Sequence, residues 1–473
     1  MATLVGLGTG KWQNKIHCSD TTTEDCLSFL PSFYNERTVN ELKLQVINRA
    51  IESDDTGLLY DLGKSKCGFV SNEIRQVAWY KILTSQLIFQ PNIFTEPTSK
   101  EKHCDENQIQ LDVNRSFGYI PNKTKSNSLK KLLNEQIVRF FRKYPQLRYY
   151  QGYHDIVSVF IITFCHNTKH GKFQIKLSHR EKERLFKCVE TFSLLYLRDF
   201  LMDSLDFPID QIGIIPKLIK EQDSVLYEKL QLDTIKPFFA IASILTIFSH
   251  DLKPDISNDN SIIFQIFDLV ICTHSMFTPL LLYSNMIIAI KSKLCEEYEQ
   301  NLENFENETD LVHGIIQKVL IETMMDSKGS KKFWSNVLNI TRNSSITNED
   351  TKKMIKKSIN KASPLQNTGS GTKLFRILEQ TDIVKLIEKG IKLNKQQKEG
   401  VIKNGDNYSQ WKYNKLIKAS LLIGVCSIAF GVSCDSKSVL SPDSFNLPLL
   451  DITKLVDATE FLANSVRNIK DSL

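Results

Sequence analysis

The sequence predicts an all-α fold, organised as one multi-helix domain over residues 61–325. Apolar residues recur there at three-to-four spacing in one segment after another, which is typical of amphipathic helices packed around a core. None of the longer apolar runs alternates with the period of two expected of a half-buried strand. At 473 residues the chain is also long enough to bury a large core.

The helices of this domain are predicted from their apolar patterns. One covers residues 127–144, where Asn127 or Ser128 would cap its start and Pro145 disfavours helical backbone in the residue before it. A second, residues 156–164, is apolar nearly all round and should lie at the centre of the core. Further apolar runs long enough for a helix lie at 238–248, 262–272 and 279–290.

The stretches on either side of the domain are more polar. Residues 1–60 contain one short amphipathic stretch and are expected to form an N-terminal extension. Residues 326–415 hold 19 basic and 8 acidic side chains, whereas residues 60–325 hold 31 and 32. The Gly-Ser-Gly string at 369–371 marks a flexible break. We therefore expect residues 326–415 to be a flexible, basic polar linker that contains one helix near 374–391.

An uncharged run of sixteen residues, 419–434, follows the linker. Spanning a bilayer takes about 20 apolar residues, and Lys415 and Lys418 can lengthen the run by placing their ammonium groups at the interface. We therefore expect residues 416–434 to form a transmembrane anchor, the alternative being a buried core helix. Residues 435–473, a short tail, carry 4 basic and 6 acidic groups, so the positive-inside rule places the lysine-rich side and the helical domain in the cytosol.

Charge and cysteine usage narrow the function classes. The net charge of +6 comes from the linker, whereas a nucleic-acid-binding core would concentrate positive charge on the folded domain. We therefore expect no nucleic-acid partner, and expect the basic stretch 326–361 of the linker to meet anionic lipid rather than act as a nucleic-acid arm. The ten cysteines form no C-x-x-C pair, which is typical of reduced thiols. The start of the chain does not look like a secretory signal.

Three short strings carry the chemistry. GFVSNEIRQVAW at 68–79 contains R-x-x-x-W, IQLDVNRSF at 109–117 contains I-x-x-D-x-x-R, and YYQGYHDI at 149–156 contains Y-x-Q-G. In this order and spacing they resemble the leading signatures of the TBC domain, the GTPase-activating module that acts on Rab proteins. The resemblance covers roughly residues 60–325.

KYPQLRYYQGYHDIVSVF at 143–160 is most similar to the membrane-anchored class of that family. The resemblance to this class implies an endomembrane location, at the endoplasmic reticulum, and a Rab of early secretory traffic as the partner. The chain departs from the wider family at 238–252, which reads FFAIASILTIFSHDL and has no Trp. This departure concerns the surface that would face the GTPase.

The resemblance implies that Arg115 and Gln151 are catalytic and act in trans on the GTPase. An arginine suits charge stabilisation because its planar guanidinium meets phosphate oxygens with parallel donors. A glutamine amide can accept from a water and donate to phosphate at once. Gly152 would allow either the close approach of another backbone or an unusual φ at the loop.

Seven residues are expected to support this pair: Asp112, Tyr149, Gly152, His154, Asp155, Arg75 and Trp79. Tyr149 and Trp79 are better explained as core aromatics than as contacts, and Arg75 as a structural partner for a carboxylate. Asp112, one turn before Arg115, is expected to orient the arginine or to cap its helix. His166 and His170 have metal-ligand spacing, but no third ligand is evident, so we expect no metal site. The resemblance also implies no cofactor of the chain's own, since GTP and Mg²⁺ arrive with the partner. The chain would then be a GTPase activator rather than a classical enzyme. The alternative is a catalytically silent Rab-binding scaffold or effector.

Overall fold

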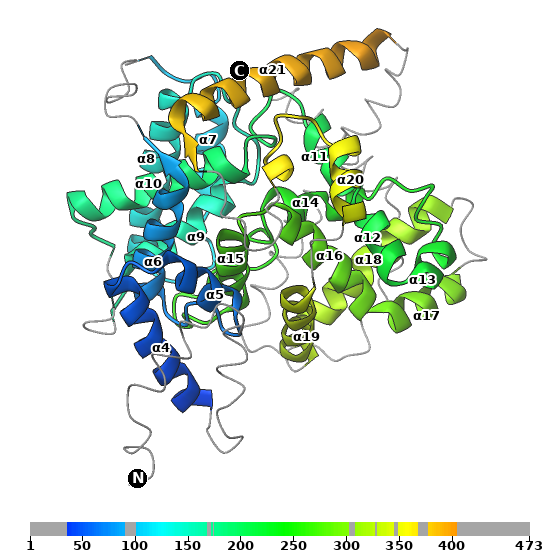
Figure 1. Cartoon of the computed structure of the whole chain (residues 1–473), viewed down its shortest axis with the longest axis horizontal. Helices are drawn as coiled ribbons and strands as arrows, with labels where there is room; N and C mark the ends of the chain where they lie inside the picture. Colours follow the sequence, from blue (N-terminus) through cyan, green and yellow to red (C-terminus); the bar gives the residue numbers. More distant parts are fainter. Residues whose placement is uncertain are drawn as a thin grey trace, which may run out of the picture.

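Helix starts follow local capping signals. Ser71, Asn122 and Ser178 each precede a helix and accept a hydrogen bond from a backbone N–H of its first turn, and Ser178 forms a capping box with Glu181. The computed structural model describes residues 36–89, 101–167, 172–173, 175–301, 308–326, 329–344, 349–367 and 377–403. Figure 1 shows these residues as helices, with few and very short strands.

The first half of the chain forms one group of helices, on the left in Figure 1. Its elements are α4 (Glu36–Glu52), α5 (Thr56–Lys64), α6 (Asn72–Gln86), α7 (Glu106–Arg115), α8 (Lys123–Lys143), α9 (Tyr153–Cys165) and α10 (His179–Tyr196).

The second half continues through shorter helices. These are α11 (Asp206–Ile212), α12 (Ile215–Gln222), α13 (Ser224–Lys229), the 3₁₀-helix η2 (Phe238–Ala240), α14 (Ile241–Leu245), α15 (Ile262–Thr273), α16 (Phe277–Ala289), α17 (Lys291–Asn301) and α18 (Glu308–Met325). The last elements are α19 (Gly329–Asn343), α20 (Glu349–Ser358), the 3₁₀-helix η4 (Pro364–Asn367) and α21 (Gln380–Lys403).

Two pairs of two-residue strands complete the described chain. β1 (Leu87–Ile88) pairs in parallel with β4 (Leu378–Glu379), and β2 (His166–Asn167) pairs antiparallel with β3 (Lys172–Phe173). The β1–β4 pair joins segments almost 300 residues apart in the sequence. It ties the start of α21 to the end of α6.

The core is centred on α9, all of whose residues are buried. This helix packs against α6, α8 and α10, while α15 packs on α5 and α6. The helices predicted at 156–164, 262–272 and 279–290 are therefore confirmed, as is the all-helical character of the domain. α8 ends at Lys143, one residue before the predicted end, but it begins at Lys123 with Asn122 as its cap, earlier than the predicted Asn127-Ser128 start.

The run at 238–248 does not form one helix as predicted. It begins as η2 and α14, and the backbone then takes positive φ at Ile247 (48°) and Phe248 (63°). Both side chains are buried, so packing holds a conformation that neither a β-branched nor an aromatic residue favours on its own. The turn that results leads into the functional site described below.

The expectation of a flexible linker over 326–415 is wrong for the described part of that stretch. Phe333, Trp334, Val337 and Leu338 of α19 are buried, and α19 packs against α16. The buried positions form one narrow stripe, and Lys, Asn and Ser occupy most of the other positions of the helix. Within the predicted N-terminal extension, residues 36–60 pack against the core, because Ile47 and Leu59 are fully buried.

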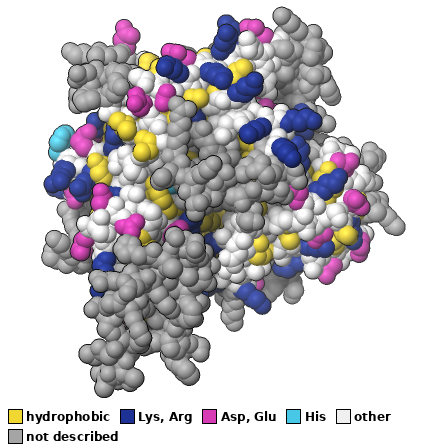
Figure 2. All heavy atoms as spheres, in the orientation of Figure 1, with side chains coloured by type: hydrophobic (Ala, Val, Ile, Leu, Met, Phe, Trp, Pro, Cys, Tyr) yellow, Lys and Arg dark blue, Asp and Glu magenta, His cyan; other side chains and the backbone are white. Residues whose placement is uncertain are grey.

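The predicted anchor at 416–434 and the tail at 435–473 lie outside the described residues. Within the described ranges, no helix combines the length and the apolar character needed to cross a membrane. On the face drawn in Figure 2, Lys and Arg side chains are interspersed with Asp and Glu.

Candidate functional site

Arg115 is the last residue of α7, and this position turns its side chain outward. Ile109 and Val113 bury the other face of the helix. The Arg115 guanidinium lies 2.9 Å from the carboxylate of Asp112, one turn earlier. The side chain of Arg115 is 45% exposed and that of Asp112 is 1% exposed. The carboxylate is therefore part of the core and orients a cation that reaches solvent.

Gln151 lies in the short loop between α8 and α9, and its side chain is partly exposed. No hydrogen bond from the described residues holds its amide. The next residue, Gly152, has φ +108°, and a Cβ there would lie 2.7 Å from the Thr246 side-chain methyl. Glycine is required for both conformation and space, and the close neighbour is this chain's own turn after α14.

Asp112 also holds the loop that carries Gln151. The hydroxyl of Tyr149, two residues before Gln151, donates to Asp112 at 2.7 Å. Gln108 donates to the same carboxylate at 3.1 Å. One buried carboxylate thus fixes Arg115 directly and the Gln151 loop through Tyr149.

The loop is anchored on two further sides. The backbone N–H of Tyr149 and the guanidinium of Arg148 donate to Asp105 at 3.0 and 2.9 Å. The hydroxyl of Tyr150 donates to the carbonyl of Leu245 at 2.9 Å. With these contacts the backbone on the N-terminal side of Gln151 has little freedom, whereas the Gln151 amide has no such restraint.

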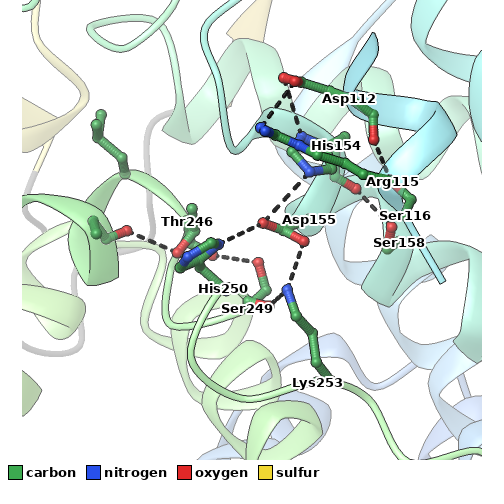
Figure 3. A network of polar contacts seen from close by, with 12 residues as sticks. Asp112, Arg115, Ser116, His154, Asp155, Ser158, Thr246, Ser249, His250 and Lys253 are labelled. Carbon is green, nitrogen blue, oxygen red and sulfur yellow. Dashed lines mark hydrogen bonds and ion pairs between the residues drawn. The ribbon is translucent and has the colours of Figure 1, made fainter. Parts of the chain in front are cut away.

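A second polar chain leads from the site to the segment after α14 (Figure 3). His154 Nδ1 lies 3.5 Å from Asp112, and its Nε2 lies 3.7 Å from Asp155. Asp155 accepts hydrogen bonds from His250 Nδ1 at 3.1 Å and from Lys253 Nζ at 2.7 Å. The first turn of α9, directly after Gly152, is thereby tied to the turn that touches Gly152.

Burial sets the protonation of these groups. Desolvation lowers the pKa of His154, so its ring is neutral at pH 7. Burial opposes the charge on Asp155, but the positive charges of His154, when protonated, and Lys253, with the hydrogen bond from His250, hold the pKa of that carboxyl well below its usual range. Lys253 Nζ, 2.7 Å away, places a positive charge directly beside the Asp155 carboxylate. Burial also raises the pKa of the Tyr149 hydroxyl, which remains a donor.

Arg75 and Trp79 lie on α6, and both side chains are fully buried. The Arg75 guanidinium pairs with Asp268 of α15 at 2.9 Å, and the Trp79 indole N–H donates to the same carboxylate at 2.8 Å. A residue without exposed surface cannot contact another protein. These two residues therefore join α6 to α15, as expected for core residues, and take no part in the exposed site.

Among the described residues, His103, Cys104 and Asp105 are the one group whose potential metal-ligand atoms lie within 4.8 Å of one another. Their donor atoms are already engaged. The His103 ring accepts from the backbone of Asp105 at 3.1 Å and bonds the carbonyl of Leu147 at 3.1 Å, while Asp105 holds Arg148. The group braces the Gln151 loop, and we assign it no metal. His170, the second residue of the predicted His spacing, lies outside the described residues.

Sequence patterns did not reveal Asp105, His250 or Lys253. Each contacts the site across a long stretch of chain, 98 residues in the case of Lys253 and Asp155. No short motif contains both partners of such a contact. A family signature can therefore name the exposed pair without naming what holds it.

Comparisons with known proteins agree with these motifs. A family model described as Rab-GTPase-TBC domain matches residues 72–295. The GTPase-activating protein GYP8 of Saccharomyces cerevisiae is 40% identical over 446 residues, which cover 90% of this chain and 87% of that protein. The GTPase-activating protein gyp10 of Schizosaccharomyces pombe is 27% identical over 59% of this chain and 67% of its own length. TBC1 domain family member 20 of Homo sapiens is 27% identical over 50% of this chain and 54% of its own length. This chain therefore belongs to the TBC-domain family of Rab GTPase-activating proteins.

Proposed function

We propose that this chain accelerates GTP hydrolysis by a Rab GTPase of early secretory traffic, with Arg115 and Gln151 inserted into the active site of the partner. The observation that carries the proposal is the shared support of the two residues by Asp112. One buried carboxylate holds the half-exposed cation directly and, through Tyr149, the loop that carries the partly exposed amide. The nucleotide and its Mg²⁺ come with the partner.

Arg115 would stabilise the charge that develops on the phosphoryl oxygens during transfer to water. Its guanidinium is oriented by Asp112 at 2.9 Å, and with 45% of the side chain exposed it can still reach a phosphate on a partner. An arginine supplied in trans increases the rate by about 10³–10⁵-fold, equivalent to roughly 4–7 kcal/mol. A lysine, with a single point charge, would not reproduce the two parallel donors.

Gln151 would hold the attacking water. Its amide oxygen can accept from the water while its NH₂ donates to a phosphate oxygen. The contacts of Tyr149 and Tyr150, together with Gly152, fix the loop backbone, and no hydrogen bond from the described part of the chain has to be broken before the amide engages. Little conformational entropy then has to be lost on binding.

The location follows from the resemblance to the membrane-anchored class. We propose that residues 416–434 anchor the chain to an endomembrane, at the endoplasmic reticulum, with the helical domain facing the cytosol. Deleting residues 416–473 should then release the protein into the soluble fraction. Retention of the truncated chain on membranes would show that another segment is the anchor.

The direct test is hydrolysis by a panel of GTP-loaded Rab proteins with the full chain added at catalytic concentration. We expect stimulation of at least one Rab of early secretory traffic, and loss of two or more orders of magnitude with Arg115→Lys or Gln151→Ala. Arg180→Lys and Gln110→Ala change the same residue types at exposed positions and serve as controls.

Two outcomes would contradict the proposal. One is that the Arg115→Lys and Gln151→Ala variants both keep most of the stimulation. The other is stable binding of a GTP-loaded Rab without any turnover, which would favour the scaffold alternative.

A further inference from the structure

Residues 197–205, between α10 and α11, pack against the Gln151 loop, and we call them the wall segment. The backbone N–H of Arg148 donates to the carbonyl of Leu201 at 2.9 Å. The ring of Tyr150 packs edge-on against the ring of Phe200, with centroids 6.0 Å apart and an interplanar angle of 85°. Phe200 and Leu201 are fully buried. Any shift of this wall segment is therefore transmitted to the loop.

Helix α21 holds the wall segment from the other side. Asn394 is 2% exposed, and its Nδ2 donates to Ser204 Oγ at 2.9 Å. Its Oδ1 accepts from the backbone N–H of Ser204 at 3.2 Å. One turn later, Lys398 pairs with Asp203 at 2.8 Å. Figure 1 shows α21 lying across one end of the molecule, where it packs on α11.

A second C-terminal element, the turn at residues 359–365, reaches the same wall. Asp199 is 2% exposed and accepts hydrogen bonds from the hydroxyl of Ser363 and from Asn360. Arg198 is 1% exposed and donates to the carbonyl of Ala362 at 3.3 Å. The wall thus has buried polar partners from two separate C-terminal elements.

Both elements lie beyond residues 72–295, the part of the chain that the family model matches. We propose that Asn394 is a positioning residue for Gln151, and that the turn at residues 359–365 together with helix α21 completes the site by bracing the wall segment under its loop. Asn394 carries the proposal because it is buried and both of its amide groups are engaged with Ser204. This inference rests on the proposed role of Gln151 as the water-holding residue.

The effect on rate follows from geometry. Replacing Asn394 by alanine removes both contacts and leaves the Ser204 N–H without its partner. A displacement of about 1 Å at a catalytic group can cost roughly 10²-fold in rate. Asn394 contacts the wall segment and not the Gln151 loop itself, so we expect a smaller loss, about tenfold, in the maximal stimulated rate. Because Asn394 is buried, the substitution leaves the exposed surface unchanged, so KM should change little.

The experiment is a double-mutant cycle on the full chain with a Rab that responds to it. Asn394→Ala, Gln151→Ala and the double variant are compared for maximal rate and for KM, with thermal unfolding recorded for each. If Asn394 acts through Gln151, Asn394→Ala lowers the rate about tenfold alone and has almost no further effect in the Gln151→Ala background. Gln396→Ala, an exposed amide on the same helix, is the matched control and should leave the rate unchanged.

The outcomes separate this inference from the function on which it rests. An additive loss in the double variant, or a loss that follows only the unfolded fraction or KM, would overturn the positioning role. An Asn394→Ala variant with the wild-type rate would do the same. A Gln151→Ala variant that keeps full stimulation would instead overturn the proposed function. Lys398→Met, which removes only the exposed pair with Asp203, should fold normally and lower the rate by about twofold or less.

Discussion

Replacing Asp112 by asparagine tests whether one carboxylate holds both exposed residues. The side chain keeps its shape and loses its charge. In the structure this carboxylate accepts from the Tyr149 hydroxyl at 2.7 Å and from Gln108 at 3.1 Å, and it lies 2.9 Å from the Arg115 guanidinium. Asparagine offers one acceptor oxygen instead of two, so these three donors can no longer all be satisfied.

The cost of this change can be worked out from the same contacts. A hydrogen bond to a charged group contributes about 1.5–3 kcal/mol, whereas a half-exposed ion pair such as that of Arg115 contributes about 0–1 kcal/mol. We expect the free energy of unfolding to fall by roughly 1–3 kcal/mol, which a large domain tolerates. Because Arg115 and the loop of Gln151 both lose their restraint, the maximal stimulated rate should fall by about 10–100-fold.

The assay is single-turnover phosphate release from a GTP-loaded Rab at saturating activator. A matched control is Asp61→Asn on α5. Asp61 forms an ion pair with Lys64 at the same spacing in the helix and also at 2.9 Å, but both side chains are well exposed. The control should keep the wild-type rate. Wild-type stimulation by Asp112→Asn, or a loss fully explained by unfolded protein at the assay temperature, would show that Asp112 does not hold Arg115 and the Gln151 loop in place.

Three further predictions concern the loop and the core. In Gly152→Ala the new Cβ would lie 2.7 Å from the Thr246 methyl, at a residue whose φ is +108°. The substitution should therefore lower the free energy of unfolding by about 1–3 kcal/mol and reduce stimulation. A stability equal to that of the wild type in urea titrations would contradict this. Burial lowers the pKa of Lys43 from 10.5 to about 7, so between pH 7 and 10 the unfolded chain binds more protons at this residue than the folded chain. The stability of the wild type relative to Lys43→Met should therefore rise with pH across that range, by up to about 1.4 kcal/mol per pH unit, and a constant difference would argue against a buried lysine. Asp268→Asn leaves the buried Arg75 guanidinium without its carboxylate and should cost about 3–5 kcal/mol in denaturant unfolding, whereas a cost below 1 kcal/mol would show that the pair is not needed.

Much of the fold could be predicted because the central helices are buried on nearly every side. In α9, α15 and α16 most residues are apolar and buried, and a helix inside the core is the structure that such a pattern predicts. The prediction failed where burial is confined to a narrow stripe. In α19 the buried Phe333 and Trp334 are surrounded by lysine, asparagine and serine, and the average composition obscured the stripe.

The candidate site divides in the same way. Arg115 and Gln151 stand in short motifs and could be proposed from the sequence. Their supports are contacts between distant segments: Lys253 with Asp155 across 98 residues, and Asn394 with Ser204 across 190. Contacts of this kind depend on how helices pack, and a single sequence contains no pattern that pairs them. The conformation of Gly152 was anticipated, but the neighbour that needs the space is this chain's own turn.

The most direct test of the central claim measures affinity for a transition-state analogue. A responsive Rab loaded with GDP and aluminium fluoride mimics the charge and geometry of the transferring phosphoryl group, so an activator that acts on the transition state should bind it at least 10²-fold more tightly than the same Rab loaded with GDP alone. We predict that the wild-type chain shows this gain, and that Arg115→Ala and Gln151→Ala each lose most of it while their affinity for the GTP-loaded Rab stays within a few fold. If Arg115→Ala and Gln151→Ala keep the full gain in affinity, these two residues do not act on the transition state.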